Sequence, residues 1–240
     1  MPAAQALVTG VRFTLSMVFI AALLAGCATN LAPQPPVAAT PPEFPAAEYE
    51  RAAAGGAPVY RIDAATSSVV IEVRRAGSLA RLGHDHVVAG YDIHGFMRAD
   101  DARADLYIPL DKLVVDESQL REIAGFDTTP SADAIEGTRR NMLGRVLEAD
   151  RFPFAVVAVR GLDEHHVASV SLTFHGATRT MPIALDVSIA DREAIVAGAF
   201  TLKQTDFGIV PLSLFGGAIE VQDAVDIRFR LRAVRGAHPE

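Results

Sequence analysis

The chain has 240 residues, 50% of them hydrophobic, and 22 Lys and Arg against 29 Asp and Glu give it a formal net charge of −7. This acidic balance argues against a nucleic-acid partner, which needs a basic face for its phosphates, and against electrostatic attachment to anionic lipid. The single cysteine excludes an intrachain disulfide.

The N-terminus is typical of a bacterial lipoprotein. An apolar run, residues 13–24, follows Arg12; it is too short to cross a bilayer as a helix but suits a signal peptide. It ends in Leu24-Ala25-Gly26-Cys27, a lipobox pattern in which the cysteine thiol accepts a diacylglyceryl group. We therefore expect a signal peptide over 1–26 and membrane attachment through lipidated Cys27. Ala28 follows the cysteine, and resemblance to enteric lipoprotein sorting then favours the periplasmic side of the outer membrane in the cell envelope.

Residues 27–58 are expected to form a tether. They are rich in proline and alanine and offer few large apolar side chains with which to build a core. We interpret them as a disordered spacer between the membrane and the domain that follows. A short helix over residues 46–54 is the alternative.

Alternation of apolar and polar residues recurs through residues 59–235 and predicts one domain of half-buried strands, followed by a short tail over 236–240. The last strand is the clearest, since Val225, Ile227, Phe229 and Leu231 alternate with charged residues. Similar rows lie within 69–73, 104–108, 170–174 and 181–189, and further strands are expected over 86–98, 154–160 and 193–203. The pattern gives about eight strands, each with one apolar and one polar face.

One substantial helix is expected among these strands. Ile135, Met142, Leu143, Val146 and Leu147 share one stripe at helical spacing, in a helix that starts at Thr129 and Pro130 and ends near Asp150. A shorter helix is expected over 118–124. Eight antiparallel strands with a covering helix fit an up-and-down barrel and a sandwich equally well on pattern alone.

Several short motifs carry a family resemblance. They are Tyr60-Arg61-Ile62-Asp63, Gly90-Tyr91 with Gly95, Phe152-Pro153, the stretch 174–180 (Phe-His-Gly-Ala-Thr-Arg-Thr), and Asp206-Phe207-Gly208-Ile209. In this order they resemble the YceI-like family of bacterial envelope proteins over roughly 59–235. The resemblance implies an all-β fold, an antiparallel eight-stranded lipocalin-like barrel with one covering helix. It also implies that the barrel holds a polyisoprenoid lipid.

The expected ligand is accordingly a polyisoprenoid lipid or quinone, buried among inward apolar side chains. Each buried CH₂ contributes about 0.8 kcal/mol, so a few prenyl units supply ample driving force before ordering costs are subtracted. The candidate lumen residues are Ile71, Leu106, Leu172, Phe174, Ile183, Leu185, Ile227 and Phe229. The alternative is that the same rows fill a solid core and the chain is a structural or interaction protein.

Three histidines support a second hypothesis, a metal-binding envelope protein. His84 and His86 project to the same face of a strand, and His94 shares their parity if no bulge intervenes at Gly90. Two imidazoles at this spacing suit a divalent Zn or Cu ion once a third ligand joins them. The alternative is a hydrogen-bonded pair near the barrel rim that meets a ligand head group.

No catalytic constellation is apparent. The sequence lacks a Gly-x-Ser-x-Gly elbow and a glycine-rich phosphate loop, and its cysteine is assigned to lipidation. Apart from the metal hypothesis, no cofactor is expected. We therefore expect a binding protein rather than an enzyme.

Overall fold

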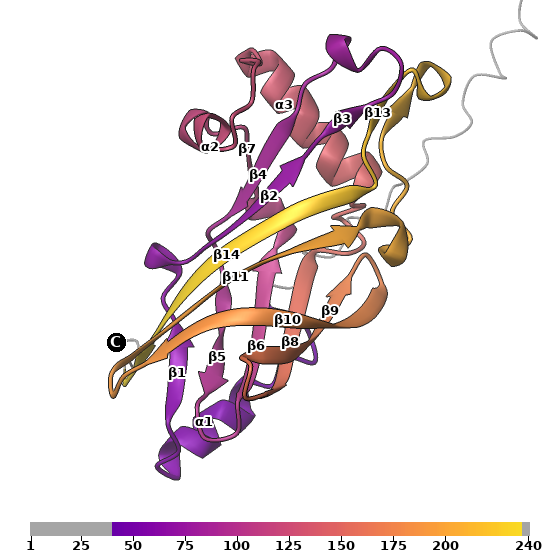
Figure 1. Ribbon diagram of the computed structural model, residues 1–240. Coiled ribbons are helices and arrows are strands. Elements are labelled where there is room, and N and C mark those ends of the chain that lie inside the picture. The colour runs from indigo at the N-terminus through magenta and orange to yellow at the C-terminus, as the bar shows by residue number, and fades with distance from the viewer. Residues whose placement is uncertain (1–39, 237–240) are drawn as a thin grey trace, which may run out of the picture. The chain divides into compact units, whose positions relative to one another are not determined.

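Eight antiparallel strands close into a barrel in the computed structural model, which describes residues 40–236 (Figure 1). Neighbours pair in the order β1–β5–β6–β8–β9–β10–β11–β14, and β14 pairs again with β1, which closes the ring. The strands are β1 Val59–Ile62, β5 His94–Arg98, β6 Arg103–Pro109, β8 Phe154–Leu162, β9 Val167–Phe174, β10 Ala177–Ile189, β11 Glu193–Lys203 and β14 Ala224–Arg235. The barrel and its covering helix confirm the predicted fold class.

Three further strands extend the sheet beyond the ring, namely β2 Ser68–Val73, β4 His86–Gly90 and β7 Val114–Val115. The long strand β14 pairs with β2 through residues 226–230 and with β1 through residues 233–235. The short helix η1, Ala64–Thr66, separates β1 from β2. β14 therefore belongs both to the closed ring and to this extension.

The strand expected over 86–98 is instead two strands, β4 and β5. Residues 91–93 interrupt it, and Ile93 is buried there. Gly95 then has a φ of +148°, and a Cβ at this position would collide with the backbone carbonyl of Asp105 on β6. A glycine is needed because the two strands approach so closely.

The covering helix is α3, Ala132–Asn141, which continues as the π-helical turn η4, Met142–Val146. Its N-cap is Ser131, whose hydroxyl accepts a hydrogen bond from the Ala134 N–H at 3.3 Å. The helix therefore begins two residues later than Thr129 and Pro130 suggest. The predicted shorter helix is also present, as α2, Ser118–Ile123. Figure 1 shows α2 and α3 at the end of the barrel opposite α1.

A small second sheet lies at the α3 end. It consists of β3 Arg75–Ala76, β13 Ile219–Val221 and β12 Ser213–Leu214. Its connections carry the short helices η2, Ala80–Leu82, and η6, Phe215–Gly217. The Leu79 N–H donates to the Ala218 carbonyl at 2.7 Å, which ties the two connections together.

The Asp-Phe-Gly-Ile motif belongs to the core. Phe207 ends the short helix η5, Gln204–Phe207, and Phe207 and Ile209 are each 1% exposed. They pack in one cluster with Leu110 and Leu147. The motif thus serves packing, with Gly208 in the left-handed conformation at the turn between the two side chains.

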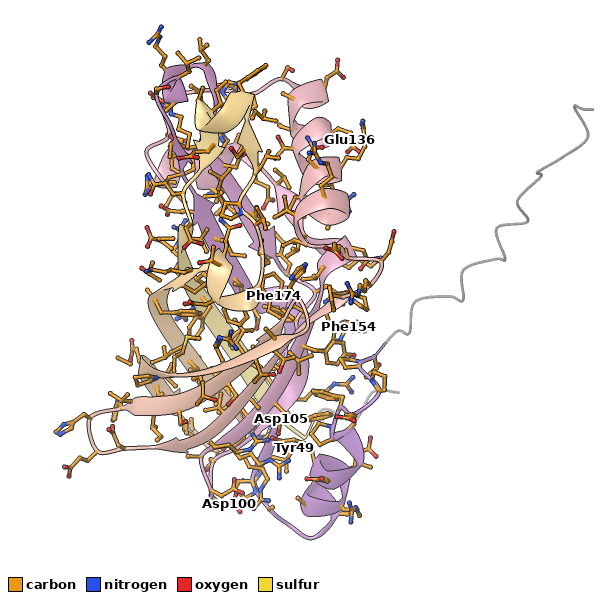
Figure 2. All side chains as sticks on the ribbon, turned by 90° about the vertical axis from the view of Figure 1, so that its right-hand side faces the viewer. Tyr49, Asp100, Asp105, Glu136, Phe154 and Phe174 are labelled. Atoms are coloured by element: carbon orange, nitrogen blue, oxygen red, sulfur yellow. The ribbon has the colours of Figure 1, made fainter. Side chains whose placement is uncertain are left out.

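Residues 46–54 are helical rather than part of a disordered tether. Here α1, Ala46–Ala54, buries Tyr49, whose hydroxyl donates to Asp105 Oδ2 at 2.7 Å, and the Tyr49 ring stacks on Phe96 (Figure 2). The tether prediction is wrong here because aromatic side chains among the prolines provide a docking face. The predicted signal peptide, Cys27 and the first part of the tether lie outside the described residues. In the described part, no helix is long and apolar enough to cross a membrane.

Candidate functional site: an apolar cavity in the barrel

The barrel encloses a cavity of about 620 Å³, within the size range of small-molecule sites. Every strand of the closed ring contributes residues to a largely apolar wall. All eight predicted lumen residues line it: Ile71, Leu106, Leu172, Phe174, Ile183, Leu185, Ile227 and Phe229. The lumen is therefore open, which argues against the filled-barrel alternative.

The cavity is elongated along the strands. On β14 every second residue from Val225 to Ala233 lines it, a distance of about 26 Å at roughly 3.3 Å per residue. Of the intervening side chains, Asp226, Arg228 and Arg232 form ion pairs on the outer face, and Arg232 contacts Asp63 at 2.6 Å and Glu193 at 2.9 Å. Strict alternation thus keeps charge on the outer face along the whole length of this strand.

Part of the wall comes from residues that were not predicted to face a ligand. Met142 and Val146 of η4 line the cavity, together with Thr138 and Asn141 of α3. The helical stripe identified in the sequence contained Met142 and Val146. Sequence periodicity indicated that this stripe was buried, but it gave no means of showing that it faced a cavity.

Polar side chains reach the wall mainly near the two ends. Arg75, His84, His86 and Glu220 line it near the small second sheet, and Arg98 and Arg103 line it at the end of β5 and the start of β6. Apart from Thr138, Asn141 and Gln204, the rest of the wall is apolar, which suits a long hydrophobic ligand with a polar group at one end.

A buried carboxylate holds His86 in place. Nδ1 of His86 lies 2.6 Å from Asp116 Oδ2, and the Asp116 side chain is fully buried. Asp116 Oδ1 accepts hydrogen bonds from the Val87 N–H at 3.0 Å and from Arg121 Nη1 at 2.6 Å. Arg121 is also buried, and it donates further to the backbone carbonyls of Asp85 and Thr128.

Asp116 is ionised in this arrangement. Burial by itself raises the pKa of this carboxyl, but the hydrogen bond and electrostatic attraction of His86, with the hydrogen bonds from the Val87 N–H and Arg121, outweigh burial and lower the pKa below its usual value. An ionised carboxylate can only accept, so Nδ1 of His86 carries the proton of their hydrogen bond.

The three predicted metal-site histidines are not brought together. His84 precedes β4 rather than lying on it, but its ring lies 6.3 Å from that of His86 and also lines the cavity. His94 does not line the cavity; it pairs with Asp92 at 2.8 Å and stacks on Tyr107. His94 was expected on the same face of one strand as His84 and His86. It is not, because residues 91–93 interrupt that strand. Within residues 40–236, no three His, Cys, Asp or Glu side chains are grouped to hold a metal ion.

Exposed apolar side chains border the cavity beside the small second sheet. Leu82 of η2 is 63% exposed and Leu214 of β12 is 40% exposed, and both also line the cavity. Phe215, the next residue after Leu214, is 82% exposed. Apolar surface is therefore continuous from the cavity wall to the outside of the protein at this end.

Comparison with solved structures gives the same fold. A polyisoprenoid binding domain from Saccharophagus degradans, implicated in plant cell wall breakdown, is 16% identical with a TM-score of 0.52; the match covers 74% of this chain and 98% of that one. BcnA from Burkholderia cenocepacia is 16% identical with a TM-score of 0.51, covering 71% and 98% respectively. Comparison with curated proteins gave no match. The YceI-like domain matches residues 60–233, and the chain therefore belongs to the YceI-like domain family.

Proposed function

We propose that this protein is a lipid-anchored periplasmic binding protein that holds a polyisoprenoid lipid or quinone inside its barrel. The observation that carries the proposal is the elongated apolar cavity of about 620 Å³. The Saccharophagus degradans relative of the same fold, a polyisoprenoid binding domain, supports this choice of ligand. Holding a lipid requires no reaction at the site, so the proposal is a binding function without catalysis.

The driving force is burial of the hydrocarbon chain. Each CH₂ removed from water contributes about 0.8 kcal/mol, and a branched prenyl chain can follow the apolar row that β14 presents from Val225 to Ala233. Ordering the chain and losing its free translation offset part of this gain. A ligand long enough to contact the whole row is accordingly favoured over a short one.

The anchor is proposed from the sequence alone. Lipidation of Cys27 would attach the chain to the outer membrane, and residues 28–39 would separate that attachment from the domain. The lipid ligand would then be exchanged close to a membrane, where such molecules are concentrated.

The proposal is tested by identifying what the protein carries. Residues 40–240, secreted to the periplasm without the lipobox, would be purified and extracted with organic solvent, and the extract would be analysed by mass spectrometry. Starting at Thr40 retains the Phe44 ring, which packs against Phe96 and Tyr107, and the Thr40 hydroxyl, 3.2 Å from that of Tyr107. One prenyl lipid or quinone per protein is expected. A lipid-free protein that also fails to take up added prenyl lipid would contradict the proposal.

Metal binding is the second candidate, favoured by one observation. A histidine that ligates a metal usually donates its other ring N–H to a carboxylate, as His86 does to Asp116. Titration of the purified protein with Zn²⁺ in a calorimeter tests this candidate. Stoichiometric binding that is lost in both His84→Ala and His86→Ala would support it, and no measurable heat would exclude it.

A further inference from the structure

Two loops meet where the cavity wall reaches the surface, and we call them together the tip. They are residues 77–84, which contain η2, and residues 213–218, which contain β12 and η6. The Leu79 N–H donates to the Ala218 carbonyl at 2.7 Å, and a Cβ at Gly77 would collide with that same carbonyl. These contacts hold the two loops as one unit at the α3 end of the protein, next to β3 and β13 (Figure 1).

The tip exposes three large apolar side chains, those of Leu82, Leu214 and Phe215. Phe215 is the most exposed large apolar residue among residues 40–236. Leu82 and Leu214 also line the cavity, so the outer surface of the tip continues the apolar wall inside the barrel. Apolar surface gathered in this way is unfavourable in water and marks a place where another apolar phase binds.

The backbone at Phe215 adds a second cost. Its φ is +52°, and Gly216 and Gly217 follow with φ values of +67° and +91°. A glycine or asparagine adopts this left-handed conformation far more readily than a phenylalanine. Packing does not offset the strain, since the ring is 82% exposed. A strained residue with an outward aromatic ring indicates a role in binding rather than in folding.

The tip carries no carboxylate, although the chain as a whole has a net charge of −7. The only ionisable side chains within its two loops are Arg81 and His84, and both are exposed. A membrane surface that contains anionic lipid attracts cations and repels carboxylates. Arg81, next to Leu82 in the chain, can extend to lipid phosphates while its neighbour enters the acyl region.

The carboxylates that flank the tip are engaged elsewhere. Asp85 and Asp127 share Arg75, at 3.5 and 2.8 Å, and Glu220 lines the cavity. Arg75 therefore offsets part of the negative charge next to the tip, and the surface that approaches a membrane is apolar with a single arginine.

A bilayer fits this patch better than a protein partner does. Three side chains of this size expose a few hundred Å² at most, well below the about 800 Å² per partner that a stable protein complex buries. Apolar side chains that enter the boundary between head groups and acyl chains need no matching surface. A lipidated Cys27 would also keep the domain beside a membrane, since residues 28–39 can extend over about 40 Å at most.

We propose that the tip docks on a lipid bilayer, with Leu82, Leu214 and Phe215 among the acyl chains and Arg81 at the head groups. The cavity then opens directly onto the hydrocarbon region, and an isoprenoid passes between membrane and barrel without crossing water. Docking itself needs no ligand in the cavity. Only the transfer of the isoprenoid rests on the function proposed above.

A single tryptophan tests the docking, because the chain contains none. The full chain with Phe215→Trp, purified in a non-ionic detergent, is reconstituted on vesicles of phosphatidylcholine and phosphatidylglycerol, with or without bromine on the acyl chains. Bromine quenches a tryptophan only when the ring lies among those chains. We expect a blue-shifted emission on plain vesicles and a loss of emission on brominated vesicles.

His165→Trp is the matched control. His165 lies in the turn between β8 and β9, and its side chain is 79% exposed. This turn is at the α1 end, since the Gly161 N–H donates to Ala102 next to Arg103, which pairs with Glu48 of α1. A tryptophan at position 165 should keep its full emission on brominated vesicles.

A charge reversal tests the role of Arg81. Added to Phe215→Trp, Arg81→Glu places a carboxylate in the tip and should reduce the quenching on vesicles that contain phosphatidylglycerol. Arg51→Glu is the matched control, since Arg51 is equally an exposed arginine but lies in α1 at the opposite end, and it should leave the quenching unchanged. Circular dichroism checks that each variant is folded.

Full emission of Phe215→Trp on brominated vesicles would overturn the proposal, as would equal quenching of His165→Trp. A blue-shifted emission that bromine does not quench, in a protein that sediments as a dimer, would assign the tip to a second copy of the chain instead. Unchanged quenching with Arg81→Glu would contradict the contact of Arg81 with head groups. Failure of the proposed ligand is distinguishable, because the vesicles contain no prenyl lipid and the quenching does not depend on it.

Discussion

Two buried aspartates, Asp105 and Asp116, are each 5% exposed and each paired with arginine, yet they have different structural roles. Asp105 lies on β6 and accepts from Tyr49 of α1, so it fastens a helix to the outside of the barrel. Asp116 accepts from His86, whose ring lines the cavity. The difference shows that a buried carboxylate can serve attachment in one place and orientation of a ligand-facing group in another. Loss of the Tyr49–Asp105 hydrogen bond should therefore affect stability alone.

The largest expected effect is that of Asp116→Asn. This change leaves the buried Arg121 guanidinium without its counter-charge, and breaking a buried pair of this kind costs about 3–5 kcal/mol. The free energy of unfolding, measured by urea denaturation, should fall by that amount. A loss under about 1 kcal/mol would mean that Arg121 does not depend on Asp116.

Tyr49→Phe should have a smaller effect and should leave the ligand site intact. Burial and the adjacent Asp105 raise the pKa of Tyr49, which keeps its hydroxyl protonated as a donor. Losing this hydrogen bond to a charged acceptor should lower the free energy of unfolding by about 1.5–3 kcal/mol.

Tyr60→Phe is the matched control, because the Tyr60 hydroxyl donates to the neutral carbonyl of Ala190 at 3.0 Å. Its loss should cost about 0.5–1.5 kcal/mol in the same urea experiment. Lipid occupancy should be unchanged in both tyrosine variants. A Tyr49→Phe protein that loses its lipid would contradict this comparison, because the contact that attaches α1 would then also affect ligand binding.

The smallest predicted effect is a difference between the wild type and Asp116→Asn in how stability depends on pH. The folded-state pKa of Asp116 lies below the usual 3.8, so its contribution is fully present above that value and is lost as pH falls through the folded pKa. The Asp116→Asn variant lacks this contribution, and its free energy of unfolding should therefore fall less steeply than that of the wild type between pH 5 and pH 3. Parallel curves would mean that the pKa of Asp116 is the same in the folded and unfolded states.

Much of the barrel could be predicted from sequence because its determinants are local. Alternation on β14 separates lumen residues such as Phe229 from outward charges such as Arg228, and this separation requires no knowledge of which strands are neighbours. The same reasoning identified all eight lumen residues. It did not establish that the lumen was open, since a filled core has the same alternation.

The two aspartates show that contacts between residues far apart in the chain could not be predicted from the sequence. Asp116 follows His86 by 30 residues and Asp105 follows Tyr49 by 56, and only folding brings either pair together. Proline content suggested that residues 46–54 would be disordered, but tertiary contacts of Tyr49 stabilise α1. Likewise, the interruption at residues 91–93 separates His94 from the cavity, and its only sequence signal was Gly90.

The central claim, that the cavity holds an isoprenoid, is tested most directly by filling the cavity. Leu172 lines it, and the adjacent Thr173 faces outward on β9, where its hydroxyl bonds that of Thr178 at 2.8 Å. Tryptophan would be introduced at each position, and the prenyl lipid that co-purifies with each folded variant would be quantified by mass spectrometry. We predict that Leu172→Trp loses most of the lipid while Thr173→Trp retains it. Equal lipid in the two variants would contradict the account, because the ligand would then lie outside the barrel.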